Sequence, residues 1–464
     1  MIASPDKFSM TRSTRFKFQA SGIRIGQAVD RVREVIPHEY LGKVVQVIGL
    51  VIESEGPLAS VGELCRIEGG VNSSDVLCEV VGFRGERVLL MPLGETHHIR
   101  PGSCVRAMGQ PMKVAVGESL LGRVLDGLGQ PIDGGEALNE CGRIPVSGNS
   151  PDILKRKRIS ERFYTGVRAI DSMIPLGKGQ RVGIFAGSGV GKSTLLGMIA
   201  RNGSSDVNVI ALVGERIREV REFIENDLGD EGLKRSVVIA ATSNQPALVR
   251  LKAASLAMAI GEYFRDQGRD VLLMMDSVTR FAMAQREIGL AVGEPPATRG
   301  YTPSVFSMLP QLLERAGTGE VGSITGLFTT LVEGDDMNDP IGDTVRAILD
   351  GHMVLSRDLA NQGHYPPIQV LESLSRLQGQ LLNSEEKALC TRVRECLETW
   401  RKNVDLIQVG AYQRGVNQDT DRKLDLAQSL NNYLRQDTHE AAPPDQVFST
   451  LKSVLQGGFT GGQL

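Results

Sequence analysis

The chain has few aromatic residues, little net charge and no long apolar run. Aromatics make up 5% of its 464 residues, with one tryptophan, which argues against a surface built for stacking bases. The formal net charge is −3, so no overall basic field draws the chain to nucleic acid, and we expect no nucleic-acid partner. The longest apolar stretch, residues 44–52, has the length of a strand and is far too short to cross a bilayer.

Metal-binding and redox motifs are also missing from the sequence. The six cysteines form no C-x-x-C pair and none lies at zinc spacing from a histidine, while the six histidines form no H-E-x-x-H motif. The N-terminus has no hydrophobic signal core. The simplest interpretation is a reduced, cytosolic chain.

A glycine-rich stretch between an apolar strand pattern and a helical pattern predicts a phosphate-binding loop for ATP or GTP. It reads Ala186-Gly187-Ser188-Gly189-Val190-Gly191-Lys192-Ser193-Thr194, and we expect residues 187–194 to bind the nucleotide. Its glycines let backbone N–H groups point at an anion. Lys192 would place a positive charge on the β- and γ-phosphates, and the Ser193 hydroxyl would ligate Mg²⁺. The usual first glycine of the G-x-x-x-x-G-K-[ST] motif is Ala186 here.

Composition and hydrophobic periodicity divide the chain into four regions. Residues 1–40 are basic and polar, which fits either a frayed terminus or a segment that docks on a partner or on anionic lipid. Residues 41–110 contain short β patterns punctuated by glycine and proline, which predicts a small β-barrel. Residues 111–380 are expected to form a P-loop ATPase domain. From about residue 166 its strands alternate with helices, which predicts a parallel sheet covered on both faces. Residues 381–464 are expected to form a helical domain.

The expected elements follow from these patterns. Barrel strands are expected at residues 44–53, 64–68, 76–83, 87–91 and 103–107. Sheet strands are expected at 181–186, 208–213, 236–241, 271–276 and 323–332. Helices are expected at 193–202, 217–226, 246–267 and 280–289, and in the C-terminal region at 385–403, 424–434 and 447–455.

Two acidic residues follow predicted sheet strands. Asp276 closes an apolar strand, and a carboxylate there can hold Mg²⁺ directly or through water. Glu215 follows an earlier strand, where it is either the group that activates water or a solvated loop acid. Arg376 carries no functional signal of its own.

Several runs together resemble the catalytic subunits of rotary ATPases and, more closely, the ATPases of type III protein export. They are residues 183–193, 214–216, 275–280, 284–290, 293–296, 331–337 and 348–352, and the similarity covers about residues 40–415. Alanine at position 186 resembles the export branch. Residues 283–286 and 300–304 favour the flagellum-specific export ATPases over those of the virulence-associated injectisome.

The resemblance implies an α/β fold, with a P-loop RecA-like parallel sheet core, an N-terminal small β-barrel and a C-terminal helical domain. It implies a Mg²⁺-dependent ATPase that assembles as a homohexamer with active sites between subunits and drives export of flagellar proteins. Lys192 would hold the β- and γ-phosphates, Ser193 and Asp276 would organise Mg²⁺, Glu215 would activate water, and Arg216 would support the phosphate site.

Two further roles come only from the resemblance. Arg376 would act as an arginine finger on the neighbouring subunit's site, and Tyr365 would stack on adenine. The sequence departs from the family pattern at residues 377–378, where Leu-Gln replaces the usual Val-Met beside the finger.

The resemblance also implies partners and a location. The N-terminal segment would bind a stator-like regulatory protein, residues 290–302 would line an opening for a central stalk-like protein, and the C-terminal helices would face the export gate and receive chaperone–substrate complexes. The protein would be cytoplasmic and associate peripherally with the inner membrane at the export apparatus.

Three other functions fit less well. The β subunit of an ATP synthase carries an acidic run near its C-terminus that this chain lacks, and an RNA-translocating ring would need an aromatic, basic barrel, whereas residues 42–108 contain only Phe83 as an aromatic. A non-catalytic nucleotide-binding subunit would not need Lys192, Glu215 and Asp276 together.

Overall fold

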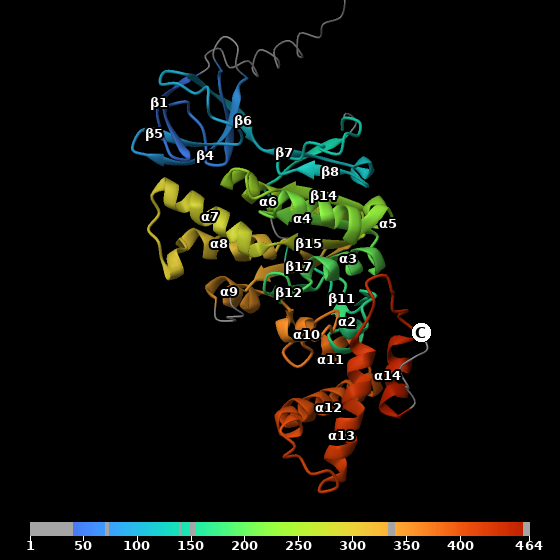
Figure 1. Cartoon of the computed structure of the whole chain (residues 1–464). Helices are drawn as coiled ribbons and strands as arrows, with labels where there is room; N and C mark the ends of the chain where they lie inside the picture. The colour runs from blue at the N-terminus through green and yellow to red at the C-terminus, as the bar shows by residue number, and fades with distance from the viewer. Residues whose placement is uncertain are drawn as a thin grey trace, which may run out of the picture.

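The computed structural model describes residues 40–69, 74–138, 141–148, 152, 154–332 and 339–457. Within them a β-barrel lies at one end of the molecule, an α/β core in the middle and a helical domain at the other end (Figure 1). This arrangement confirms the predicted fold class. The predicted docking segment, apart from Tyr40, lies outside the described residues, as does most of the motif at 331–337.

Six antiparallel strands close into the barrel in the order β1-β2-β5-β4-β3-β6. They are β1 (Gly42–Ile48), β2 (Val51–Glu55), β3 (Glu63–Ile67), β4 (Val76–Arg84), β5 (Arg87–Pro92) and β6 (Cys104–Pro111). The prediction of one strand over residues 44–53 is wrong. Gly49 adopts φ 57°, which permits a tight turn, and Ile48 pairs with Val51 across it.

The core sheet has the order β19-β18-β12-β17-β15-β13-β14-β8, and all neighbours are parallel except β18 and β19. Its strands are β8 (Val124–Asp126), β12 (Arg181–Ala186), β13 (Val207–Val213), β14 (Ser236–Ala241), β15 (Asp270–Asp276), β17 (Ser323–Leu331), β18 (Gly351–Leu355) and β19 (Leu374–Ser375). The sequence did not predict β8, β18 or β19. Because the central strands are parallel, their carboxyl ends meet at one edge, where ligands bind in such sheets.

Shorter strands flank the core. They are β7 (Lys113–Val116) paired with β9 (Gly142–Pro145), β10 (Arg162–Phe163) paired with β11 (Leu176–Gly177), and β16 (Gly317–Thr318) paired with β17.

Helices cover both faces of the core sheet. The helices of this part of the chain are α2 (Arg168–Met173), α3 (Lys192–Asn202), α4 (Ile217–Glu222), a π-helical turn (Phe223–Leu228), α5 (Gly229–Lys234), α6 (Ala247–Asp266), α7 (Val278–Val292), α8 (Pro303–Leu313), α9 (Pro340–Ile348), α10 (Arg357–Asn361) and α11 (Gln378–Leu381). In β13, Val209 and Ala211 pack in the apolar cluster that contains α6, whereas Ile210 and Leu212 pack in the cluster that contains α3. Both faces of the strand are therefore buried, as its continuous apolar sequence requires.

The C-terminal domain consists of α12 (Ser384–Gln408), α13 (Gln418–Leu434) and α14 (Val447–Leu455). A capping box starts α12, in which Asn383 and Glu386 bond each other's backbone N–H groups. Arg162 of the core pairs with the same Glu386, which fixes the domain to the sheet. No helix in the described part of the chain is long and apolar enough to cross a lipid bilayer.

Gly197 of α3 offers a test of this packing. A Cβ at Gly197 would lie 2.5 Å from the backbone oxygen of Asp227, so we expect Gly197→Ala to destabilise the protein by about 1–3 kcal/mol although alanine is the better helix former. Gly379, exposed in α11, has nothing within 4 Å of its added Cβ and is the matched control. Denaturant unfolding measures both variants, and equal stability of the two would contradict this packing.

Candidate active site

The phosphate-binding loop joins β12 to α3. Gly189 (φ 74°) and Gly191 (φ 96°) adopt left-handed conformations that suit glycine, and α3 begins at Lys192. Ala186 is the last residue of β12, is buried, and pairs with Leu331 and Leu355 on the two neighbouring strands. Its extended backbone needs no glycine, which explains how alanine is accommodated there.

Lys192 lies between two carboxylates that come from other strand ends. Its Nζ bonds Asp276 Oδ1, at the end of β15, and lies 3.9 Å from Glu215 Oε1, just after β13. Glu215 comes this close because Gly214, at φ 72°, turns the chain directly after the strand. The structure therefore brings together Lys192, Glu215 and Asp276, the first and last of which are 84 residues apart in the sequence.

Glu215 has an unusual proton affinity. Burial raises the pKa of its carboxyl to about 7; the nearby Asp276 carboxylate adds to the rise, and the Lys192 ammonium opposes it. A carboxyl with this pKa can both take up and release a proton near neutral pH.

Two residues at the site were missed by the sequence predictions. The Thr329 hydroxyl donates to Asp276 Oδ1 at 2.7 Å and so orients that carboxylate. Arg280 lines the cavity beside the loop, and its buried Nε has no hydrogen-bond partner among the described residues. The available signal was the position of Arg280 in the first turn of α7, because the start of a helix that directly follows a strand lies near the end of that strand.

A cavity of about 370 Å³ opens in front of the loop. It is lined by loop residues, Glu215, Arg216, Glu219, Glu222, Asp227, Arg280 and Leu331. A second cavity of about 260 Å³ adjoins it and shares Gly191 and Thr194. Its other walls are Leu195, Met198, Tyr365, Pro366, Pro367, Gln436 and Thr438. The charged space and the mainly apolar slot together match the two parts of a nucleotide.

The two arginines that the sequence analysis assigned to the site, Arg216 and Arg376, lie farther out. Arg216 is at the mouth of the larger cavity, with a side chain 77% exposed and 3.4 Å from Glu219. Arg376 follows β19 at the edge of the sheet, is exposed, and donates to the Arg346 carbonyl at 3.4 Å. It lines neither cavity of its own chain.

Comparison with known proteins identifies the family. Residues 166–375 match the ATP synthase alpha/beta family, nucleotide-binding domain, residues 44–109 match the beta-barrel domain of that family, and residues 382–453 match the T3SS EscN ATPase C-terminal domain. The flagellum-specific ATP synthase of Bacillus subtilis is 54% identical over 92% of this chain and 98% of that protein. This chain belongs to the type III export ATPases.

Other relatives place this export ATPase close to both branches of the family. The flagellum-specific ATP synthase of Treponema pallidum is 52% identical over 92% of this chain and 95% of its own length. The type 3 secretion system ATPase of Xanthomonas euvesicatoria is 48% identical over 89% and 93%. The solved structure of the assembled ATPase EscN of enteropathogenic E. coli superposes with a TM-score of 0.84 at 42% identity, covering 89% of this chain and all of that one.

The balance of charges around Glu215 predicts opposite shifts of its pKa in two variants of the nucleotide-free protein. Asp276→Asn should lower the pKa of Glu215 below 7 because a repelling charge is lost, and Lys192→Met should raise it because an attracting charge is lost. ¹³C NMR of glutamate-labelled protein measures the titration, with Glu215→Gln to assign the signal. Arg218→Met, exposed on α4, should leave it unchanged. Equal pKa values in all variants would contradict the geometry.

Proposed function

We propose that this export ATPase hydrolyses ATP with Mg²⁺ at active sites between the subunits of a homohexamer, and couples hydrolysis to the export of flagellar proteins. The observation that carries the proposal is that Lys192 and Glu215 line one cavity at the carboxyl edge of the sheet, with the buried Asp276 carboxylate bonded to Lys192. Full-length similarity to flagellum-specific ATP synthases supports the export role.

The residues at the strand ends fit Mg²⁺. The Asp276 carboxylate and the Ser193 hydroxyl are hard oxygen donors of the kind this ion prefers, and the bond from Thr329 fixes the orientation of the carboxylate. Held by these two residues, Mg²⁺ would supply positive charge to the phosphate oxygens during hydrolysis. We propose that Ser193 and Asp276 hold it there.

The side chains around the cavity divide the work of hydrolysis. Residues 187–194 hold the phosphates through backbone N–H groups, and Lys192 exchanges its contact with Asp276 for the β- and γ-phosphates. Glu215 accepts a proton from the attacking water at its carboxylate, for which a pKa near 7 is suited. Arg280 from within and Arg216 from the mouth add positive charge to the phosphate site.

The smaller cavity is the proposed site for adenine. The Tyr365 ring lies close to the loop, since a Cβ added to Gly191 would be 3.6 Å from it. It faces an apolar slot bounded by Pro366 and Pro367, in which stacking of a base would bury its faces. This placement supports the predicted role of Tyr365 and adds Gln436 and Thr438 as neighbours of the base.

We further propose that Arg376 completes the site of a neighbouring subunit. Its exposed position at the sheet edge, outside both cavities of its own chain, supports action in trans. The structures of related EscN, assembled and in complex with its central stalk EscO, support a ring around a stalk-like protein. That residues 290–302 line the opening is proposed from the family resemblance.

The remaining partners are proposed from the family resemblance. They are a stator-like regulatory protein, the export gate and chaperone–substrate complexes, with the protein in the cytoplasm and peripherally associated with the inner membrane. A second candidate function, ATPase of an injectisome, is favoured by 48% identity to the Xanthomonas euvesicatoria protein.

Mixing two inactive variants tests the shared active site. Lys192→Ala lacks a functional loop and Arg376→Ala lacks the finger, so each should be inactive alone. In rings formed at equal amounts, about a quarter of the sites should combine an intact loop with an intact finger from the next subunit, and ATPase activity should return to that extent. Mixing Lys192→Ala with the Lys192→Ala/Arg376→Ala double variant should restore nothing. If well-formed mixed rings stay inactive, Arg376 does not act in trans.

Deletion of the gene in its native bacterium distinguishes the two export systems. We expect loss of flagella and swimming, restored by the wild-type chain but not by Glu215→Gln, whose hydrolysis should fall about 10²- to 10⁴-fold while nucleotide binding remains. Swimming and flagellar counts, together with secretion of effector proteins, provide the measurement. Loss of effector secretion with swimming retained would replace the flagellar assignment by the injectisome.

A further inference from the structure

One wall of the smaller cavity comes from the segment that connects α13 to α14. Gln436 and Thr438 of this segment line the slot beside Tyr365. The backbone N–H of Gln436 donates to the Tyr365 carbonyl at 2.9 Å. The C-terminal domain therefore supplies part of the proposed base site, from positions more than 240 residues after the phosphate-binding loop.

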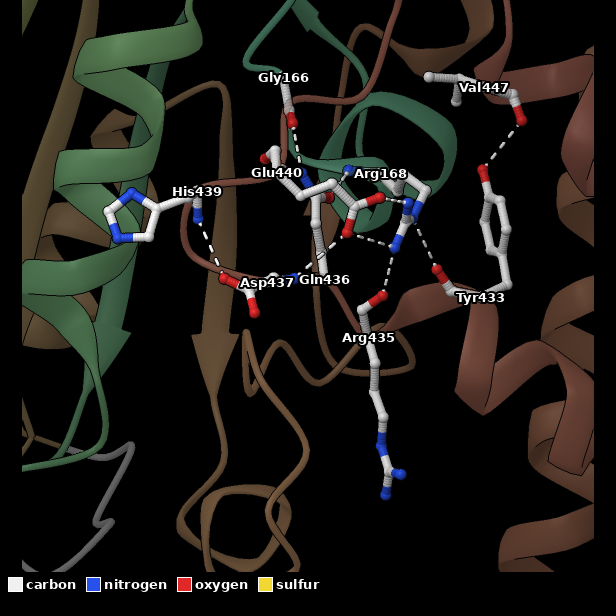
Figure 2. Close-up of polar contacts among 9 residues, drawn as sticks. All are labelled: Gly166, Arg168, Tyr433, Arg435, Gln436, Asp437, His439, Glu440 and Val447. Carbon is white, nitrogen blue, oxygen red and sulfur yellow. Dashed lines mark hydrogen bonds and ion pairs between the residues drawn. The ribbon is translucent and has the colours of Figure 1, made fainter. Parts of the chain in front are cut away.

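Arg168, at the start of α2, holds the end of α13 and the first part of this segment, up to Glu440. Its guanidinium donates to the Tyr433 carbonyl at 3.0 Å and to the Arg435 carbonyl, and it forms a bidentate pair with Glu440 (Figure 2). Tyr433 lies in the last turn of α13, whose carbonyls lack partners within the helix and favour a nearby cation. The Arg168 side chain thus caps the C-terminal end of α13 and fixes the path of the residues that follow it.

The side chain of Gln436 is held by hydrogen bonds to residues on both sides of it. It is 5% exposed; its Oε1 accepts from the Arg168 backbone N–H at 2.8 Å, and its Nε2 donates to the carbonyls of Gly166 at 2.7 Å and Glu440 at 2.8 Å. Arg201, near the end of α3, also donates to the Thr438 carbonyl. With both polar atoms of the Gln436 side chain hydrogen-bonded, its position follows from that of residues 166–168 and Glu440.

We propose that Arg168 is a positioning residue that sets the preference of the site for a nucleotide over a base-free polyphosphate, by fixing the wall formed by Gln436 and Thr438. The proposal rests on the assignment of the base to the cavity beside Tyr365. Neither Gln436 nor Thr438 lines the larger, phosphate-binding cavity. Loosening the wall therefore weakens contacts to the base and leaves those to the phosphates in place.

Arg162 provides a matched control. It is also buried, with a side chain 19% exposed against 12% for Arg168, and it also pairs with a glutamate, Glu386, and with a backbone carbonyl, that of Leu381. Its guanidinium lies over the Phe448 ring at 5.5 Å, as that of Arg168 lies over Tyr433 at 5.9 Å. It anchors the same domain at the start of α12, without contacting the cavity wall.

The experiment compares the binding of ADP and inorganic tripolyphosphate by calorimetry in the full chain. Arg168→Ala should weaken ADP about tenfold and leave tripolyphosphate within about twofold, whereas Arg162→Ala should lower the melting temperature without a selective loss of ADP. Arg168→Lys should restore part of the ADP affinity, because an ammonium can pair with Glu440 but cannot serve all the acceptors. In steady-state kinetics of Arg168→Ala, the KM for ATP should rise by a larger factor than kcat falls.

Failure of the positioning role and failure of the base assignment would give different results. Equal weakening of both ligands in Arg168→Ala, or the same ADP loss in Arg162→Ala, would overturn the positioning role. Tyr365→Ala tests the base site alone: unchanged ADP affinity there would remove the base from this cavity and the inference with it. A loss in Tyr365→Ala without one in Arg168→Ala overturns the inference only. If Arg168→Ala does not fold, Glu440→Gln, which keeps the size of the side chain, must show the selective loss of ADP.

Discussion

The ammonium of Lys192 balances two carboxylates that the parallel sheet forces together. Asp276 and Glu215 end up at the same edge because β13 and β15 are parallel neighbours, and both side chains are largely removed from water. Burial raises the pKa of Glu215, and the neighbouring Asp276 carboxylate raises it further, so ionisation of both groups depends on a nearby cation. When Lys192 turns to phosphate, a divalent cation beside Asp276 would take over the balancing charge. The proposed phosphate site and the proposed proton acceptor are therefore parts of one charge arrangement.

The sequence predicted the features that depend on neighbouring residues. Strand periodicity placed β12 and β14 to the residue, and the glycine pattern placed the loop, because both follow from local backbone preferences. Asp276 and Glu215 could be found because Asp276 ends a recognisable strand and Glu215 comes two residues after the end of another, and parallel strands bring such positions together. Only the resemblance to a family assigned Arg376 and Tyr365, whose local sequence has no chemical signal.

The rest depended on contacts between distant segments. Strand β8 lies in a glycine-rich region without strand periodicity, and it is recognisable only through its pairing with β14. The break between β1 and β2 depended on one glycine within an otherwise continuous apolar run. Gln436 could not be found from sequence, since an amide on a polar connecting segment becomes a cavity wall only after α13 and α14 have packed on the core.

The parts of the proposed nucleotide site are held in place by different parts of the fold. The strand ends belong to a sheet whose two faces are buried, and the loop continues from one of its strands, so the proposed phosphate contacts rest on a densely packed part of the chain. The wall of the base cavity is attached to the C-terminal helices through a few polar groups around Arg168, and the proposed finger Arg376 extends from the sheet edge toward a neighbour. On the proposed assignments, a change at the C-terminal helices would reach the nucleotide through its base, and a change at the subunit interface would reach it through the γ-phosphate. Since the base takes no part in bond cleavage, the first change would alter affinity and the second would alter the rate of hydrolysis.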